Sequence, residues 1–177
     1  MSQVDPITAP VLETERLILR KLTLDDAGFI LELLNEPAFV RFIGDRGVRG
    51  LDDAREYLVK GPLASYERYG FGLWLVMLKT TGERLGICGL IKRDSLPDID
   101  IGYAFLERFW LKGYASESAA AVKNHAMHAL GFKRLVAITD QDNTGSSRVL
   151  EKIGLKYERL VRLSGDGPEL KLYSVEA

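Results

Sequence analysis

The sequence predicts an α+β (mixed α/β) fold, with one mostly antiparallel mixed sheet of about seven strands flanked by four helices. Seven short segments rich in Leu, Ile and Val are bounded by Gly, Asp or Pro, which is typical of strands. Four other segments carry apolar residues at helical spacing. Helices alternate with strands only in part, and three strands follow one another mid-chain. That order favours a mixed sheet over a doubly wound parallel one.

The predicted strands share short length and apolar composition. They are Arg16–Arg20, Trp74–Leu78, Leu85–Ile91, Ile99–Leu106, Leu135–Thr139, Lys156–Leu163 and Leu170–Val175. Thr80-Thr81-Gly82 separates the second from the third, and a short turn ending in glycine predicts a hairpin there.

The four predicted helices are Asp25–Asn35, Leu51–Lys60, Ala115–Leu130 and Ser146–Ile153. Gly61-Pro62 interrupts the second, which can resume after the proline. The third is the clearest, because its small apolar residues recur at helical spacing and allow close approach to a sheet. Gly154 is well placed to end the fourth.

Composition limits the classes of protein. A chain of 177 residues suits one domain, residues 1–177, in which we expect residues 1–12 to be a flexible extension. A net charge of −1 argues against general affinity for nucleic acids or membrane surfaces. The single Cys can form neither an internal disulfide nor, alone, a zinc cluster. Phe71–Leu78, the longest apolar stretch, is far shorter than the ~20 residues that cross a bilayer. Since the N-terminus also lacks a signal-peptide pattern, we expect a cytoplasmic protein.

The most informative stretch is Trp110–Glu117 (WLKGYASE), which leaves the fourth predicted strand and enters the long helix. A helix N-terminus presents unpaired N–H groups and a partial positive charge, so it binds anions. Gly113 allows a tight turn and close approach to a phosphate, Ala115 is small, and Lys112 adds positive charge. The pattern predicts a pyrophosphate cradle, and an unliganded glycine turn is the equally weighted alternative.

The same octapeptide resembles the acyl-CoA pyrophosphate loop of the GNAT acetyltransferase superfamily. Four further stretches resemble the family in the same order, and together they span about residues 14 to 160: Thr14–Arg20, Gly86–Leu90, Asp100–Tyr103 and Asn143–Leu155. The first is similar to the opening strand of the branch that includes the ribosomal-protein N-terminal (alanine/serine) acetyltransferases. The resemblance implies a sheet splayed between its fourth and fifth strands, and transfer of acetyl from acetyl-CoA to a primary amine.

Two positions that bear on the chemistry depart from the common family pattern. Many members begin the pyrophosphate motif with Gln or Arg. Trp110 stands at that position here, and a tryptophan there is common in this branch. Many members also carry a tyrosine general acid just before a Glu-Lys pair. That position is Leu150 here, which excludes a tyrosine acid at this place.

The resemblance also implies a cofactor site. The pyrophosphate is expected on main-chain N–H groups of Leu111, Lys112, Gly113, Tyr114, Ala115 and Ser116. The pantetheine arm is expected to lie beside the fourth strand and to bond backbone groups near Phe105. Asn143 matches the family Asn that bonds this arm, and its alternative role is a helix N-cap or turn residue.

Transfer to an amine requires the neutral amine. A lysine amine, with a pKa of about 10.4, is almost wholly protonated at pH 7, whereas about one-tenth of an α-amine with a pKa of about 8 is neutral. A base is therefore nearly essential for lysine and helpful for an N-terminus. Asp100 matches a family acidic residue near the acceptor and could take the proton directly or through water. The alternative is an exposed charge or a salt bridge.

The leaving group is a thiolate with a pKa of about 8.5, so a general acid adds only a modest factor. Ser146 is the family-matched hydroxyl near the sulfur, with a helix N-cap as its alternative role. The amine can attack the thioester directly, so no covalent enzyme intermediate is implied. A backbone N–H around Ala104 or Phe105 would polarise the carbonyl. We expect no metal.

The acceptor is the least constrained part of the prediction. The branch resemblance favours a protein N-terminus, and the alternatives are a small amine (polyamine, antibiotic or amino acid) or a non-catalytic CoA-binding module. Acceptor loops are expected from Pro37–Gly70 and from the hairpin around Ser164–Pro168. An acidic acceptor pocket favours a polyamine, and a narrow uncharged pocket favours a peptide terminus. We expect a monomer or homodimer.

Overall fold

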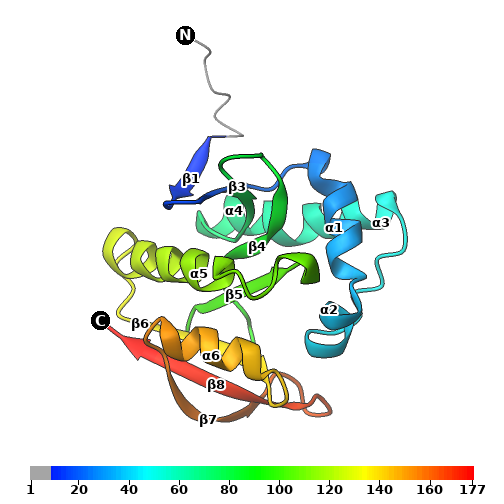
Figure 1. The fold of residues 1–177 in the computed structure, drawn as a ribbon. Helices are drawn as coiled ribbons and strands as arrows, with labels where there is room; N and C mark the ends of the chain where they lie inside the picture. The colour runs from blue at the N-terminus through cyan, green and yellow to red at the C-terminus, as the bar shows by residue number, and fades with distance from the viewer. Residues whose placement is uncertain (1–8) are drawn as a thin grey trace.

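One sheet of eight strands organises the computed structural model, which describes residues 9–177 (Figure 1). Its strands stand in the order β1-β2-β3-β4-β5-β6-β8-β7. Their bounds are β1 Pro10–Glu13, β2 Leu17–Lys21, β3 Leu73–Leu78, β4 Arg84–Ile91, β5 Asp100–Phe105, β6 Arg134–Asp140, β7 Lys156–Arg162 and β8 Glu169–Glu176. Every neighbouring pair is antiparallel except β5 and β6.

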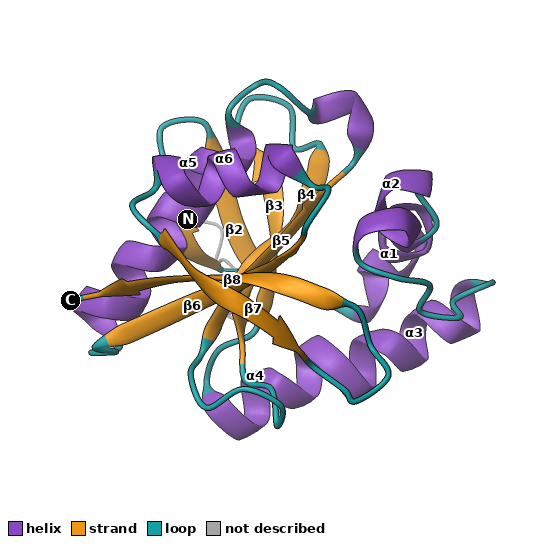
Figure 2. Ribbon diagram, turned by 90° about the horizontal axis from the view of Figure 1, so that it is seen from below, coloured by secondary structure: helices purple, strands orange, loops and turns teal. Residues whose placement is uncertain are grey.

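Helices cover both faces of the sheet (Figure 2). They are α1 Ala27–Leu34, α2 Pro37–Phe42, α3 Leu51–Leu58, α4 Ala64–Tyr69, α5 Tyr114–Asn124 and α6 Thr144–Lys152. On one face, α5 packs its small residues Ala119 and Val122 into the main core cluster. On the other, α1 and α3 bury leucines against Leu75 and Ile87. Each helix thus buries the apolar stripe that its sequence spacing provides.

The predicted fold class is confirmed, and the seven predicted strands correspond to β2–β8. The eighth strand, β1, pairs with β2, so part of the segment expected as an extension belongs to the sheet. Residues 1–8 of that extension lie outside the described residues. The hairpin at Thr80-Thr81-Gly82 is also confirmed, since the Leu78 N–H donates to the Glu83 carbonyl at 2.9 Å.

The second predicted helix does not break at its proline. A π-helical turn, Val59–Leu63, joins α3 to α4 through Gly61-Pro62. Proline has no N–H to donate, and the wider turn accommodates it without ending the helix. The short helix α2 was not predicted.

The splay between β5 and β6 positions the site. These parallel strands have one register pair, Asp100 with Val136, and the Val136 N–H donates to the Ile99 carbonyl at 3.1 Å. Beyond that pair, β5 has a neighbour on one side only, β4. The predicted splay between the fourth and fifth predicted strands is therefore confirmed.

The alternation of the β4–β5 ladder decides which β5 groups are free. The Leu106 N–H donates to the opposite Leu85 carbonyl at 3.0 Å, so every second residue back along β5 also bonds β4. Gly102 and Ala104 belong to that bonded set. The main-chain groups of Tyr103 and Phe105 point the other way, toward the opening between β5 and β6.

Candidate active site

The loop before α5 has an unusual backbone. Leu111 has φ 61° with its side chain fully exposed, and Gly113 has φ 82° as the N-cap of α5. Glycine adopts this left-handed conformation without strain, whereas for leucine it is uncommon. Because Gly113 has no side chain to cap the helix, the amides of Tyr114, Ala115 and Ser116 have no acceptor from the helix itself. The geometry is that of an anion-binding helix N-terminus.

A brace from the turn between β1 and β2 fixes this loop. The Arg16 guanidinium donates from Nη1 to the Lys112 carbonyl at 3.0 Å and from Nε to Glu117 Oε2 at 2.7 Å. It also lies over the Tyr114 ring, 4.6 Å from the centroid. The other Glu117 oxygen accepts from the Thr14 hydroxyl at 2.6 Å and from the Arg16 N–H at 3.0 Å. Partial burial alone would raise the pKa of Glu117, but these hydrogen bonds hold it below its ordinary value.

The open edge of β5 lies next to the same loop. The Trp110 indole N–H donates to the Phe105 carbonyl at 2.9 Å, which ties the loop back to the strand. The Phe105 carbonyl is therefore engaged, while the Phe105 N–H faces the opening. Of the two amides expected to polarise the thioester, that of Ala104 is directed to β4, which leaves Phe105.

The N-terminus of α6 faces β5 across the opening. Asn143 is the N-cap, and its Oδ1 accepts from the Ser146 N–H at 3.1 Å. Ser146 is thus in the first turn of α6 and is not the N-cap, so the alternative role weighed for it is wrong. Its hydroxyl lies 2.9 Å from the Tyr103 hydroxyl, which also donates to the Ser146 carbonyl at 3.1 Å. Burial raises the pKa of Tyr103, which keeps the phenol protonated.

Asp100 is buried, with 1% of its surface exposed. Arg93 Nε donates to its Oδ2 at 3.1 Å, while its Oδ1 has no hydrogen-bond partner among the described residues. Burial raises the pKa of Asp100, and the Arg93 charge opposes this only in part. Asp100 is thus in a salt bridge, but a raised pKa and one free oxygen are also the properties of a proton acceptor.

The predicted site residues divide between the two faces of the sheet. Ile101 and Phe105 belong to the core beneath α5, and Tyr103 packs against the same cluster. Asp100 stands on the opposite face, because side chains alternate along a strand. Gly102 shares that face, and a Cβ there would meet the Ile91 side chain at 2.7 Å. The opening between β5 and β6 connects the two sets.

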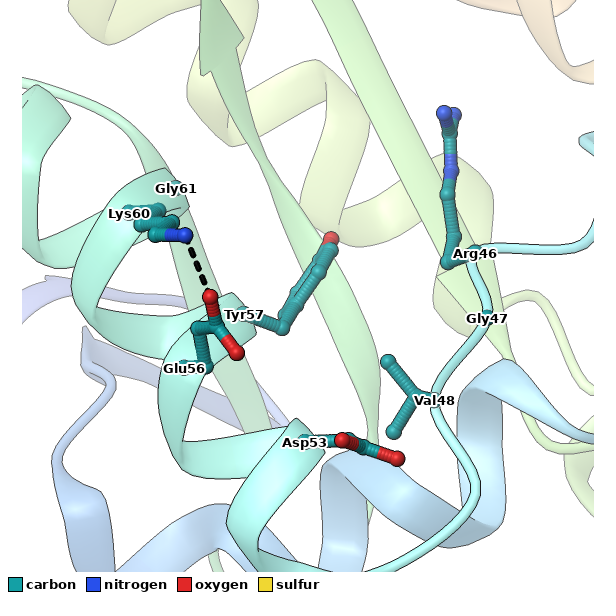
Figure 3. A pocket seen from close by; sticks show the side chains of 8 residues that line it. All are labelled: Arg46, Gly47, Val48, Asp53, Glu56, Tyr57, Lys60 and Gly61. Atoms are coloured by element: carbon teal, nitrogen blue, oxygen red, sulfur yellow. Dashed lines mark hydrogen bonds and ion pairs between the residues drawn. The ribbon is translucent and has the colours of Figure 1, made fainter.

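Two adjoining cavities lie on the Asp100 face. One, of about 360 Å³, is bordered by α4, the turn before it, and the ends of β3 and β4. The other, of about 500 Å³, is bordered by α3 and the loop that carries Arg46 (Figure 3). They share Arg46, Tyr57, Lys60 and Gly61. Burial raises the pKa of Tyr57, and the charges of Arg46 and Arg93 partly oppose that rise.

Sequence reasoning missed Arg16, Tyr103 and Arg93, since each acts through a partner on another element or loop. A signal existed for Arg16 and Tyr103, which lie in the family-like stretches Thr14–Arg20 and Asp100–Tyr103, and none for Arg93. Within residues 9–177 no group of three or more His, Cys, Asp or Glu side chains is arranged to hold a metal ion. No helix in the same residues is long and apolar enough to span a bilayer.

A mixed sheet that opens between two parallel strands, with a glycine-entered helix N-terminus beside the opening, defines an acetyltransferase of the GNAT type. Residues 16–156 match the family model described as acetyltransferase (GNAT) domain, and the chain belongs to this family. It is 33% identical to the uncharacterized protein YkkB of Bacillus subtilis (strain 168), over 85% of this chain and 88% of the relative. It is 30% identical to the uncharacterized N-acetyltransferase YoaA of the same organism, over 86% of both chains.

Solved structures give the same result for the fold. An acetyltransferase from Agrobacterium tumefaciens str. C58 superposes with a TM-score of 0.81 at 26% identity and covers 100% of both chains. The ribosomal L7/L12 alpha-N-protein acetyltransferase RimL, solved in complex with coenzyme A, gives a TM-score of 0.80 at 19% identity, over 95% of this chain and 98% of that one. The predicted family and enzyme class are confirmed, and the protein is an acetyltransferase.

Proposed function

We propose that the protein uses acetyl-CoA and acetylates a primary amine by direct attack across the opening between β5 and β6. The observation that carries this is the uncapped first turn of α5 beside the free edge of β5. The pyrophosphate binds the amides of residues 111–116, and Lys112 adds a positive charge there. Arg16 holds the loop in this shape before the ligand arrives.

The pantetheine arm lies along β5 as an added strand. The main-chain groups of Tyr103 are directed to that position and would pair with its amides, which leaves the Phe105 N–H for the thioester. Asn143 bonds the arm from the α6 side through Nδ2, since its Oδ1 is used to cap the helix. RimL, a structural neighbour, was solved with coenzyme A, which supports this choice of cofactor for the fold.

Acetyl transfer then proceeds in one addition and one elimination. The amine nitrogen attacks the thioester carbonyl carbon, whose oxygen is stabilised by the Phe105 N–H. The C–S bond breaks, and the electron pair leaves with the sulfur as a thiolate. The Ser146 hydroxyl, 2.9 Å from the Tyr103 hydroxyl, turns its single proton from that partner to the sulfur and donates a hydrogen bond there.

Asp100 removes the proton from the amine, directly or through one water, from the opposite face of β5. Its Oδ1 is free to accept the proton, and its raised pKa makes it a stronger base than an ordinary aspartate. This modest base suits an α-amine, of which about one-tenth is already neutral at pH 7. We therefore favour an α-amine acceptor, with a protein N-terminus as the leading case and a small molecule as the alternative.

Turnover tests the proposal. Thiol release from acetyl-CoA is monitored with a panel of N-terminal peptides, amino acids and polyamines, and products are identified by mass. We expect acetylation of at least one α-amine. Cofactor binding without turnover on any acceptor would instead indicate a non-catalytic CoA-binding module.

A further inference from the structure

The cavity of about 360 Å³ on the Asp100 face has an uneven charge. Five cationic side chains border it and no carboxylate does: Arg46, Lys60, Arg68, Lys92 and Arg93. The chain as a whole carries a net charge of −1, so this concentration of positive charge is local. Cavity walls of one charge sign focus the electrostatic potential and attract ligands of the opposite sign.

Only two of these cations are neutralised by the protein. Lys60 is paired with Glu56, and Arg93 with Asp100. In the described part of the chain, Arg46, Arg68 and Lys92 have no carboxylate oxygen within 4.0 Å. Three positive charges therefore face the cavity without a counter-charge from the protein.

The cavity is also built to hold a small group. Its volume falls within the roughly 300–1,000 Å³ of small-molecule sites. Leu73, Ile91 and the Tyr69 ring contribute apolar wall, which lowers the local dielectric and strengthens charge interactions. Tyr57 adds a hydroxyl, which Figure 3 shows directed away from α3 toward the space between that helix and Arg46.

Asp100 connects this cavity to the acetyl-transfer site. Arg93 borders the cavity and bonds Asp100. Ile91, another wall residue, pairs with Asp100 in the β4–β5 ladder. Asp100 itself is buried and does not border the cavity, so the amine of an acceptor held there would reach the carboxylate past Arg93 or through a water.

We propose that the cavity binds an anionic group of the acceptor, so that the preferred substrate is a primary amine with a carboxylate close to it. The inference rests on the proposed function and narrows it. The carboxylate lies among Arg46, Arg68 and Lys92, and the amine lies toward Asp100. A polyamine, cationic along its length, is repelled by the same side chains. A free amino acid and a peptide N-terminus followed by an acidic residue present the same chemistry.

Paired acceptors test the charge preference. The peptide amides Ala-Glu-Gly and Ala-Gln-Gly differ in one negative charge near the same α-amine, and free alanine and alaninamide differ in the α-carboxylate. A diamine serves as the cationic comparison. We expect kcat/KM to favour an anionic member of these pairs roughly tenfold or more, and the favoured pair distinguishes a peptide from an amino acid.

Variants assign the preference to the cavity. Arg68→Gln and Lys92→Gln should each raise KM for the anionic acceptor by up to about fivefold, with KM for acetyl-CoA unchanged. The KM for the neutral acceptor should change little in either variant. Arg55→Gln is the matched control, because Arg55 is an exposed arginine on α3 that does not border the cavity. Neutral acceptors or the diamine used equally well, or a preference that survives both substitutions, would overturn the inference.

Direct binding separates this inference from catalysis. Calorimetry with the CoA-saturated protein measures binding of Ala-Glu-Gly and Ala-Gln-Gly amides without turnover. Tighter binding of the acidic peptide or of free alanine, lost in the Arg68→Gln/Lys92→Gln double variant, supports the anionic site even if no acceptor is acetylated. Equal or no binding of charged and neutral members contradicts it even if an acetyltransferase activity is found.

Discussion

Arg16 and Glu117 are joined three times, by the Arg16 main-chain N–H at 3.0 Å, by Nε at 2.7 Å and by Nη2 at 2.7 Å. This pair connects the turn before β2 to α5 across a separation of 101 residues in the chain. Since the same guanidinium also donates a hydrogen bond to the Lys112 carbonyl, the shape of the loop before α5 depends on a turn near the N-terminal end of the chain.

The first prediction concerns this brace. Arg16→Ala removes the bond to Lys112 and the cover over Tyr114, so the loop loses its preset shape and cofactor binding must order it. We expect the Kd for acetyl-CoA to rise roughly tenfold, as for a loss of about 1.4 kcal/mol. Lys79→Ala is the control, since it removes a side-chain ion pair with Glu13 and no contact with the loop before α5. If the Kd of Arg16→Ala for acetyl-CoA equals that of the control, Arg16 does not prepare the loop for cofactor binding.

The second prediction uses two glycines with similar backbone. Gly113 has φ 82° and Gly131 has φ 75°, so alanine at either position is strained and should lower stability by about 1 kcal/mol. At Gly113 the added Cβ also meets Arg16 Nη2 at 3.3 Å, and it would stand where we propose that the pyrophosphate binds. Thermal unfolding and calorimetry should show similar destabilisation, but loss of CoA binding only in Gly113→Ala. Equal CoA affinity in the two variants would contradict the cradle.

The third prediction concerns Asp100 as the base. In Asp100→Asn no carboxylate takes the proton, so the rate depends on the amine's own deprotonation. We expect kcat to fall about a hundredfold, with the greatest loss at low pH and a nearly unchanged Kd for acetyl-CoA. Asp98→Asn is the matched control, because Asp98 lies two residues earlier and pairs with Arg134 outside the site. An unchanged pH–rate profile in Asp100→Asn would exclude the role.

The fourth prediction separates the hydroxyl of Ser146 from the helix cap. Asn143 caps α6 through the main-chain N–H of Ser146, which Ser146→Ala retains. The variant should therefore fold normally, while kcat falls roughly fivefold to tenfold because the thiolate loses a hydrogen-bond donor. If Ser146→Ala keeps the wild-type kcat even where departure of the thiolate limits the rate, the hydroxyl plays no part in the reaction.

The fifth prediction concerns stability and pH. Asp26 is fully buried, and burial alone would raise its pKa, but hydrogen bonds from Arg20, Thr23 and Arg84 hold the pKa below its ordinary value. Its stabilising contribution is therefore present above the unfolded pKa of about 3.9 and is lost as pH falls through the lower folded pKa. Asp26→Asn should lower the free energy of unfolding at pH 7 by about 3 kcal/mol and flatten its decline in acid. Asp52 is an exposed ion-pair partner of Arg55, so Asp52→Asn should change the free energy of unfolding little at any of these pH values. Urea unfolding from pH 7 to pH 3 makes the comparison.

Features that depend on a short local pattern could be predicted from the sequence. The loop with Gly113 and the helix after it follow from residue types within eight positions, and the strands follow from runs of apolar residues. The strand β1 and the helix α2 have four and six residues, too few for a periodic pattern to emerge. Pro62 predicts a helix break, yet a π-helical turn carries the helix through it.

Features that require distant partners could not be predicted. Asp100 was identified by its position in a family motif, but only the fold reveals that Arg93 binds one oxygen and leaves the other free. The cavity beside it draws its cations from a loop, α4 and the end of β4, which no single stretch of sequence brings together. The basic lining, on which the proposed acceptor preference rests, could not be predicted from composition, since the whole chain is nearly neutral.

Amide chemical shifts give the most direct test of the central claim, that main-chain N–H groups at the start of α5 hold the diphosphate of the cofactor. A ¹⁵N-labelled sample is titrated with coenzyme A while the amides of Tyr114, Ala115 and Ser116 are followed. The account predicts large shifts of these three amides that saturate at one CoA per chain. Saturable binding that leaves these amides unmoved, or no binding by the folded protein, would contradict it.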